Sequence, residues 1–198
     1  MRNRMLLPNI LTVTGASKRE RTRARLAEHA IALFEDQGFE ATSVAQIADA
    51  AGVSEMTFFR HFGSKEQAVL TDPFDPVVAA AVGARPLGEA PLERAARGLH
   101  SALAALSEAD LATARRRTAI VARTPVLRAA AATQNEVTVT AIAERLAGDG
   151  ADPFAATVAA QAVIAAVTTA LYAWAERPER SLAATVGAAL EVLDPDHD

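Results

Sequence analysis

Residues 41–70, ATSVAQIADAAGVSEMTFFRHFGSKEQAVL, carry the clearest structural pattern of the N-terminal part of the chain. It predicts a short helix over 43–50, a turn at AGVS, and a second short helix over 54–61. Two short helices joined by a glycine-containing turn of a few residues form a helix-turn-helix. The small side chain of Ala48 lets the helices cross closely, and Gly52 permits the turn.

A third helix precedes this pair. Residues 17–37 repeat apolar side chains at helical spacing, which predicts one buried face. The residues of this face are Leu26, Ala30, Ile31 and Phe34. We expect Phe58 and Phe62 to lie in the same core, so that the other side chains of 54–61 point outward, where they can enter a major groove.

The rest of the chain also predicts helices, because it is rich in alanine and no stretch alternates apolar and polar residues. Capping boxes begin at Ser17, Ser43 and Ser64, and the capping residues Thr124 and Asp152 precede prolines. The expected helices beyond residue 63 are 64–82 with an interruption near Pro73 and Pro76, 90–106, 108–122, 125–147, 153–176 and 181–193.

Composition excludes several kinds of chemistry. The 198 residues include no cysteine, which excludes disulfides, thiolate zinc sites and cysteine nucleophiles. The four histidines are far apart, and no serine-hydrolase, zinc-protease or P-loop motif occurs, so we expect no enzyme, no cofactor and no metal site. The longest apolar stretch, 162–175, is shorter than the roughly 20 residues that cross a bilayer, so we expect a cytoplasmic protein without a membrane span.

Charge is distributed unevenly. Residues 1–70 carry nine Lys and Arg against eight Asp and Glu, a net +1, whereas residues 71–198 carry eleven against sixteen, a net −5. The run SKRERTRAR, residues 17–25, has five basic residues and one acidic residue. This asymmetry is typical of a chain whose N-terminal half faces a polyanion, although an arginine-rich first turn also occurs on solvated helix faces.

Residues 41–70, with Arg21, Phe34, Gly38 and Phe39 upstream, resemble the DNA-binding signature of TetR-type bacterial transcriptional regulators. The resemblance implies a repressor that binds a near-palindromic DNA operator as a homodimer and responds to a small-molecule effector. Together with the helix pattern it predicts an all-α chain with three parts: a flexible extension over 1–16, a helix-turn-helix DNA-binding domain over 17–63, and a helical ligand-binding and dimerisation domain over 64–198.

The resemblance carries over to individual residues. It implies contacts with DNA phosphates from Thr42, Ser43, Thr57, His61 and Lys65. The candidates for the groove and its bases are Ala45, Gln46, Ser54, Glu55, Met56, Phe59 and Arg60. Structural roles stay open for some of them: Thr57 as a bond to its own helix, His61 as a solvated residue at a helix end, and Met56 and Phe59 as partial core residues.

Three positions depart from the family pattern. Phe59 replaces the usual tyrosine, which removes a phenol contact and retains apolar contact with a thymine methyl group. Glu55 stands where basic or polar residues are frequent, and Ala45 stands where arginine is common. Because a glutamate accepts from cytosine N4 but repels phosphate, the operator sequence does not follow from the resemblance.

The helix expected over 153–176 is apolar over much of its circumference, so more than the core of its own domain must bury it. The helix over 181–193 adds a second apolar stripe, and its alanines allow close helix packing. We expect a two-fold dimer built from these two helices as a four-helix bundle, with burial inside one large monomeric bundle as the alternative.

TetR-like proteins hold an effector pocket among their C-terminal helices. The candidates are polar residues on otherwise apolar helices: His100, Arg117, Gln134, Asn135, Thr138, Gln161, Thr168, Tyr172 and Trp174. Ordinary surface or core positions for His100, Gln134 and Asn135 remain alternatives, as does dimer packing for Tyr172 and Trp174. The basic run 115–117 is either a solvated face or part of a site for an anionic ligand.

MTFFRHFGSKEQAVLTDPFDP, followed by RPLGEAPL, also resembles the actinobacterial subgroup that includes regulators of the mycofactocin system, some of which bind acyl-CoA. The rival interpretations are an activator, a regulator without a ligand, and an all-helical acyl-CoA-like binding protein or enzyme without DNA binding. Retention of Thr57, His61 and Lys65 argues against the loss of DNA binding.

Overall fold

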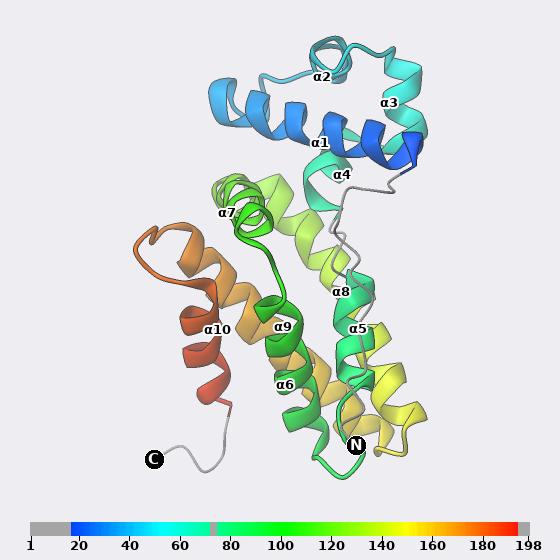
Figure 1. Cartoon of the computed structure of the whole chain (residues 1–198), viewed down its shortest axis with the longest axis vertical. Coiled ribbons are helices and arrows are strands. Elements are labelled where there is room, and N and C mark those ends of the chain that lie inside the picture. Colours follow the sequence, from blue (N-terminus) through cyan, green and yellow to red (C-terminus); the bar gives the residue numbers. More distant parts are fainter. Residues whose placement is uncertain (1–16, 72–74, 194–198) are drawn as a thin grey trace, which may run out of the picture. The chain divides into compact units, whose positions relative to one another are not determined.

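The computed structural model of the protein describes residues 17–71 and 75–193, so the predicted extension over 1–16 lies outside the described residues. The described residues form ten helices and no strand, which confirms the all-α class (Figure 1). The helices are α1 (Lys18–Gln37), α2 (Val44–Ala50), α3 (Glu55–His61), α4 (Lys65–Leu70), α5 (Asp75–Gly83), α6 (Pro91–Ala104), α7 (Glu108–Arg123), α8 (Pro125–Gly148), α9 (Pro153–Ala175) and α10 (Leu182–Glu191).

The chain divides into two compact units, residues 1–65 and residues 66–198. The first unit contains α1, α2 and α3 around a small apolar core. Its buried residues include Leu26, Ala30, Ile31, Phe34, Phe39, Ile47, Ala48, Phe58 and Phe62. The apolar face predicted for α1 and the core positions predicted for the two phenylalanines of the third helix are therefore confirmed.

Local capping explains where several helices begin. The predicted capping boxes at Ser17 and Ser43 are present. Each serine side chain accepts from the backbone N–H of the third helical residue, and the side chain of that residue accepts from the backbone N–H of the serine. A further box at Ser107 escaped prediction because its returning side chain belongs to an aspartate, Asp110. Thr124 is the N-cap residue of α8 before Pro125, as predicted, but its hydroxyl donates to the carbonyl oxygen of Ile120 at 2.8 Å and makes no capping bond.

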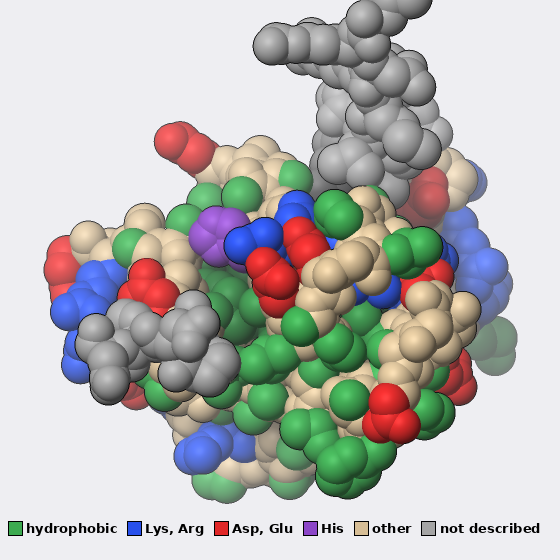
Figure 2. Space-filling model, turned by 90° about the horizontal axis from the view of Figure 1, so that it is seen from below, with side chains coloured by type: hydrophobic (Ala, Val, Ile, Leu, Met, Phe, Trp, Pro, Cys, Tyr) green, Lys and Arg blue, Asp and Glu red, His purple; other side chains and the backbone are tan. Residues whose placement is uncertain are grey.

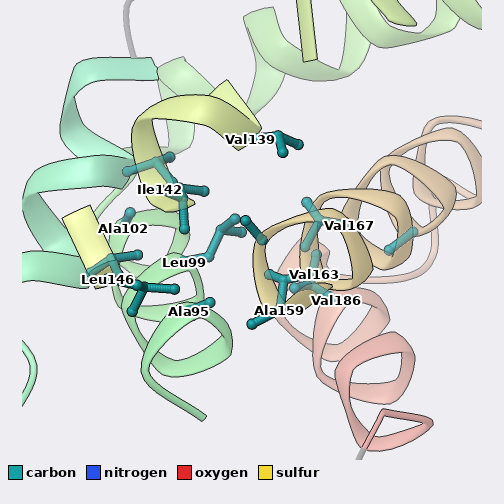
Figure 3. Close-up of a cluster of buried hydrophobic side chains, with 14 of the residues drawn as sticks. Ala95, Leu99, Ala102, Val139, Ile142, Leu146, Ala159, Val163, Val167 and Val186 are labelled. Atoms are coloured by element: carbon teal, nitrogen blue, oxygen red, sulfur yellow. The ribbon is translucent and has the colours of Figure 1, made fainter. Parts of the chain in front are cut away.

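The core of the second unit lies between α6, α8, α9 and α10 (Figure 3). Leu99 of α6, Ile142 of α8 and Val163 of α9 point toward one another in this core (Figure 3). At Gly98 a Cβ atom would lie 2.6 Å from the Cα atom of Val82. Only glycine therefore allows α5 and α6 to cross this closely.

A charged network closes the end of α8 against the helices beside it. Arg94 of α6 is 3% exposed, and its Nη2 atom donates to Oδ2 of Asp149 at 2.8 Å. Arg145 of α8 donates to the same carboxylate oxygen at 3.0 Å. A buried cation needs such a partner because an uncompensated buried charge is strongly destabilising.

Helix α9 agrees to within one residue with the helix expected over 153–176. It has 23 residues and the length and composition of a helix that could cross a membrane, which corrects the expectation that no segment reaches that length. Seven of its residues, from Ala156 to Trp174, are buried inside the second unit. Side chains at its start remain outside this core, since Phe154 is 78% exposed.

Candidate nucleic-acid interface and ligand site

The turn between α2 and α3 places the third helix at the surface of the first unit. Gly52 takes a backbone φ of 63°, which side-chain-bearing residues rarely adopt, and the N–H of Val53 donates to the carbonyl oxygen of Ala48 at 2.9 Å. Fully buried Phe58 anchors α3 from below. One face of α3 is thus fixed in the core and the opposite face is turned to solvent.

The solvent face of α3 carries Glu55, Met56, Phe59 and Arg60, all of which are exposed. Met56 is 79% exposed and Phe59 is 52% exposed. The alternative that these two side chains serve the core is therefore wrong for Met56, and only part of the Phe59 ring packs inward. Exposed large apolar side chains on a short helix are typical of a surface that contacts another molecule.

Hydroxyl groups organise the polar side of α3. Ser54 caps the helix by accepting from the N–H of Thr57 at 3.2 Å, and the two hydroxyl oxygens lie 3.1 Å apart. The Nη2 atom of Arg60 donates to the Thr57 hydroxyl at 3.3 Å. Thr57 therefore bonds other side chains of its helix and holds the Arg60 guanidinium along the surface.

The start of α2 differs from the prediction at one residue. Thr42 is 2% exposed, and its hydroxyl donates to the carbonyl oxygen of Gly38 at 2.8 Å while accepting from Gln37 at 3.1 Å. Its hydroxyl is thus unavailable, which contradicts the predicted phosphate contact. Ser43 and Gln46 are exposed, and Gln46 accepts from the N–H of Ser43 at 2.8 Å in the capping box.

Lys65 is partly buried and has a structural role that the sequence did not reveal. Its Nζ atom donates to the carbonyl oxygens of Phe39 at 2.8 Å and Thr42 at 3.1 Å. It also lies 4.1 Å from the centre of the Phe39 ring. An ammonium group has three donors, so one N–H remains for a partner such as a phosphate.

His61 ends α3 next to basic side chains of α1. Its Nδ1 atom is buried without a hydrogen-bond partner, and Arg23 donates to its carbonyl oxygen at 2.6 Å. Burial, followed by the charges of Arg19, Arg60 and Arg23, lowers the pKa of His61 below its usual value. No residue of α1 was among the predicted contacts, although the basic run over 17–25 indicated a surface that faces a polyanion.

Arg23 is also positioned by an aromatic ring, because its guanidinium lies 4.4 Å from the centre of the Phe62 ring. This stacking and the bond to the His61 carbonyl hold a cation of α1 beside the end of α3. The described part of the first unit thus brings Arg23, Arg60 and Lys65 into one small domain with the predicted contact residues.

A cavity of about 430 Å³ lies in the second unit between α8 and α9. A second cavity of about 110 Å³ shares three of its lining residues, Asn135, Thr168 and Tyr172, all of which were predicted. The Nδ2 atom of Asn135 donates to the Thr168 hydroxyl at 3.0 Å. Predicted Arg117 lines the smaller cavity, whereas Arg128, which was not predicted, lines the larger one.

Tyr172 gives these cavities an aromatic wall with a polar end. The Arg128 guanidinium lies 5.9 Å from the centre of its ring. Burial raises the pKa of Tyr172, and the charge of Arg128 only partly offsets this. The phenol therefore stays protonated at neutral pH and can donate a hydrogen bond to a ligand.

Five predicted ligand residues, Trp174 among them, line neither cavity. His100, Gln134 and Gln161 are exposed, and Thr138 is buried. Trp174 is 2% exposed within a single copy of the chain, which contradicts the alternative that it packs at a dimer interface. Among residues 17–71 and 75–193, no group of three His, Asp or Glu side chains is arranged to hold a metal ion.

Comparison with known proteins accounts for both units. Residues 26–70 match the family model of bacterial regulatory proteins of the tetR family, and residues 89–198, more than half of the chain, match the MftR C-terminal domain. The chain belongs to the TetR family and has an MftR-type C-terminal domain. The resemblance seen in its sequence is therefore confirmed.

Two named TetR-family relatives match different lengths of the chain. The HTH-type transcriptional regulator TcmR of Streptomyces glaucescens is 42% identical over 96 residues, which are 48% of this chain and 42% of TcmR. The mycofactocin biosynthesis transcriptional regulator MftR of Mycobacterium tuberculosis is 29% identical over 182 residues, 89% of this chain and 91% of MftR. The chain thus spans less than half the length of TcmR but most of the length of MftR.

A solved structure of the same family has a similar fold. The TetR-family repressor FadR of Thermus thermophilus, in complex with lauroyl-CoA, superposes with a TM-score of 0.50 at 25% identity. The superposition covers 86% of this chain and 92% of FadR. An N-terminal helix-turn-helix followed by a larger helical unit is thus the fold of this TetR-family chain.

Proposed function

We propose that this chain is a cytoplasmic transcriptional repressor that binds a near-palindromic operator as a homodimer and releases it when a small molecule binds. The observation that carries the proposal is the solvent-exposed face of α3, held outward by buried Phe58 and by the turn at Gly52. The family match and the similarity to the transcriptional regulators TcmR and MftR support a regulator in preference to an enzyme.

In this proposal α3 enters the major groove and its neighbours fix it on the DNA backbone. Ser43, Thr57, His61 and Lys65 contact phosphates, and Arg23 joins them from α1. Gln46, Ser54, Glu55, Met56, Phe59 and Arg60 face the groove. Phosphate contacts set the register on the duplex, whereas base contacts set the sequence preference.

The homodimer forms through α9 and α10. Phe154 and Val158 of α9 and Val192, the C-cap residue of α10, are large apolar side chains that stay exposed in one copy of the chain. Hydrophobic side chains also form a broad area on the face of the molecule seen from below (Figure 2). A two-fold dimer covers such a surface and presents two copies of α3 to the two halves of an operator.

The effector occupies the adjoining cavities of α8 and α9. Arg128 and Arg117 favour an anionic group, the wall of Tyr172 favours an apolar part, and Asn135 and Thr168 supply hydrogen bonds. The lauroyl-CoA in the FadR structure is a ligand of this class, anionic at one end and apolar at the other. Its binding favours a spacing of the two α3 helices that no longer fits the operator.

Selection of duplexes from a random pool by the purified chain tests the DNA-binding part. We expect a two-fold symmetric motif, bound by a dimer. Glu55→Gln or Arg60→Ala should change the preference at a single base pair by about 1–3 kcal/mol if the side chain reads that pair. Failure to select any duplex at low salt would overturn the proposal.

Addition of lauroyl-CoA to the selected complex tests the effector part. We expect release of DNA by the wild type, a higher required concentration for Arg128→Ala, and unchanged release for Arg123→Ala, which removes an exposed arginine of α7 outside both cavities. Binding of lauroyl-CoA by a chain that selects no DNA would instead favour the second candidate, an acyl-CoA-binding protein.

A further inference from the structure

The exposed face of α3 is divided into a polar side and an apolar strip. Thr57 and Arg60 are joined by a hydrogen bond of 3.3 Å, and His61 follows them on the same side of the helix. Met56 and Phe59 lie three residues apart, so they are neighbours on the helix surface. We call these two residues the apolar strip of α3.

The apolar strip is held in place although it is exposed. The rings of Phe59 and Phe58 meet edge to face, with centres 5.6 Å apart and planes at 89°. Because Phe58 is fully buried, it supports the Phe59 ring from the core side and leaves the outer half of that ring in water. Met56 is 79% exposed and, with a flexible thioether, can adapt to the shape of a partner.

Such a strip needs an apolar partner to bury it. Base edges in the major groove present mainly hydrogen-bond donors and acceptors, and the C5-methyl group of thymine is the apolar exception. The charged residues beside the strip on α3 are Glu55 and Arg60, and the Arg60 cation is suited to a phosphate. Burial of the Met and Phe side chains is therefore most favourable in free energy where thymine methyl groups replace the water around them.

We propose that Met56 and Phe59 read the C5-methyl groups of thymines in each operator half-site and are specificity-determining residues. The inference rests on the proposed DNA-binding function and specifies the base chemistry that this function recognises. Part of the affinity for DNA then comes from van der Waals and hydrophobic contact with these bases. This contribution is separate from any hydrogen bonds that Glu55 or Arg60 makes.

Replacement of thymine by deoxyuridine tests the proposal, because it removes the methyl group and keeps the base pair. The full chain is titrated by fluorescence anisotropy against its selected operator and against duplexes with single and symmetric replacements. We expect affinity to fall about fourfold for each contacted methyl group, the equivalent of about 0.8 kcal/mol per buried carbon group. Symmetric replacement in both half-sites should lower affinity roughly fifteenfold.

Two variants test whether the apolar strip causes the loss of affinity for deoxyuridine. Met56→Gln keeps the length of the side chain and Phe59→Leu keeps an apolar one that is smaller than the ring. Each should reduce the ratio of thymine to deoxyuridine affinity at its own position toward one. Leu87→Ala is the matched control, because Leu87 is also an exposed large apolar residue but lies outside α3 and the first unit. It should leave the ratio unchanged, and circular dichroism verifies that every variant is folded.

The outcomes separate this inference from the proposed function. Tight binding that is indifferent to deoxyuridine at every thymine of the half-site overturns the inference and leaves the DNA-binding function intact. A thymine preference that persists unchanged in both Met56→Gln and Phe59→Leu also overturns it, since another residue then reads the methyl group. Absence of any selected duplex overturns the proposed function and this inference together.

Discussion

The ammonium group of Lys65 lies 4.1 Å from the centre of the Phe39 ring and donates to the Phe39 carbonyl oxygen at 2.8 Å. A second bond, to the carbonyl oxygen of Thr42 at 3.1 Å, ties the same cation to the residue before the cap of α2. The first residue of α4 thereby fixes the segment that leads into the helix-turn-helix.

Lys65→Met should therefore weaken folding as well as DNA binding. Two carbonyl oxygens lose a charged donor, so we expect the free energy of unfolding to fall by about 1–3 kcal/mol. If the remaining N–H contacts a phosphate, the slope of log affinity against log salt concentration should also decrease by about one. Chemical denaturation and salt titration measure the two effects.

Lys18→Ala is the matched control, because Lys18 is an exposed lysine at the start of α1. We expect its unfolding curve to match the wild type. Wild-type stability in Lys65→Met would mean that the two carbonyl bonds contribute nothing, and an unchanged salt slope would remove Lys65 from the phosphate contacts.

Arg115 should control the fluorescence of Trp174, the single tryptophan of the chain. Its guanidinium lies 4.2 Å from the Trp174 ring centre, and it donates to the carbonyl oxygens of Trp174 and Arg180, each at 3.0 Å. We expect Arg115→Ala to shift the emission maximum to longer wavelength as water reaches the ring. We also expect it to lower the free energy of unfolding by about 2 kcal/mol.

Arg123→Ala removes an exposed arginine from the last turn of the same helix and should leave both the emission maximum and the unfolding curve unchanged. Identical emission spectra for Arg115→Ala and the wild type would show that the guanidinium does not shield the Trp174 ring.

Asp149 should make stability depend on pH in the acidic range. Its hydrogen bond from Arg94 is the largest cause that holds the pKa of this carboxyl below its usual value, with a further contribution from Arg145. The unfolded chain therefore binds this proton at a higher pH than the folded chain. Its stabilising contribution is complete above the usual carboxyl pKa and is lost as pH falls through the lower folded pKa.

Asp149→Asn should be less stable than the wild type at neutral pH, because Arg94 is then buried without its anion. Its unfolding free energy should vary less than that of the wild type below about pH 5. Glu144→Gln, which removes an exposed acid of α8 five residues before Asp149, should retain the wild-type pH profile. Parallel profiles for Asp149→Asn and the wild type would contradict the assignment.

Most of the fold could be predicted because its signals are local. The boxes at Ser17 and Ser43 and the spacing of Phe58 and Phe62 each depend on residues within four positions of one another. The exposed face of α3 followed from the same spacing, since a short helix that buries one side presents the other to solvent.

The contacts that distant residues make could not be predicted in this way. The buried hydroxyl of Thr42 and the role of Lys65 depend on how the chain returns on itself. Arg128 escaped notice as a pocket residue because only the packing of α8 against α9 shows that it lies near Tyr172. Polar residues on apolar helices were an incomplete signal, since His100 points to solvent.

His61 should make DNA affinity depend on pH near neutrality. In the free protein burial and the charges of Arg19, Arg60 and Arg23 hold the pKa of His61 below its usual value, so it is neutral. A bound phosphate favours the imidazolium, so binding takes up a proton and affinity should rise as pH falls from about 8 to about 6. One proton limits the change to less than tenfold per pH unit.

Protonation of His61 has the opposite effect on folding: stability decreases as pH falls, whereas DNA affinity increases. Because the unfolded chain binds this proton at a higher pH than the folded chain, a fall in pH through this window favours unfolding, so affinity must be measured well below the melting temperature. His61→Gln retains hydrogen-bonding capacity without titration and should bind with a flatter pH profile. His100→Gln, an exposed histidine of the second unit, should keep the wild-type slope. Equal slopes for the wild type and His61→Gln would remove His61 from the phosphate contacts.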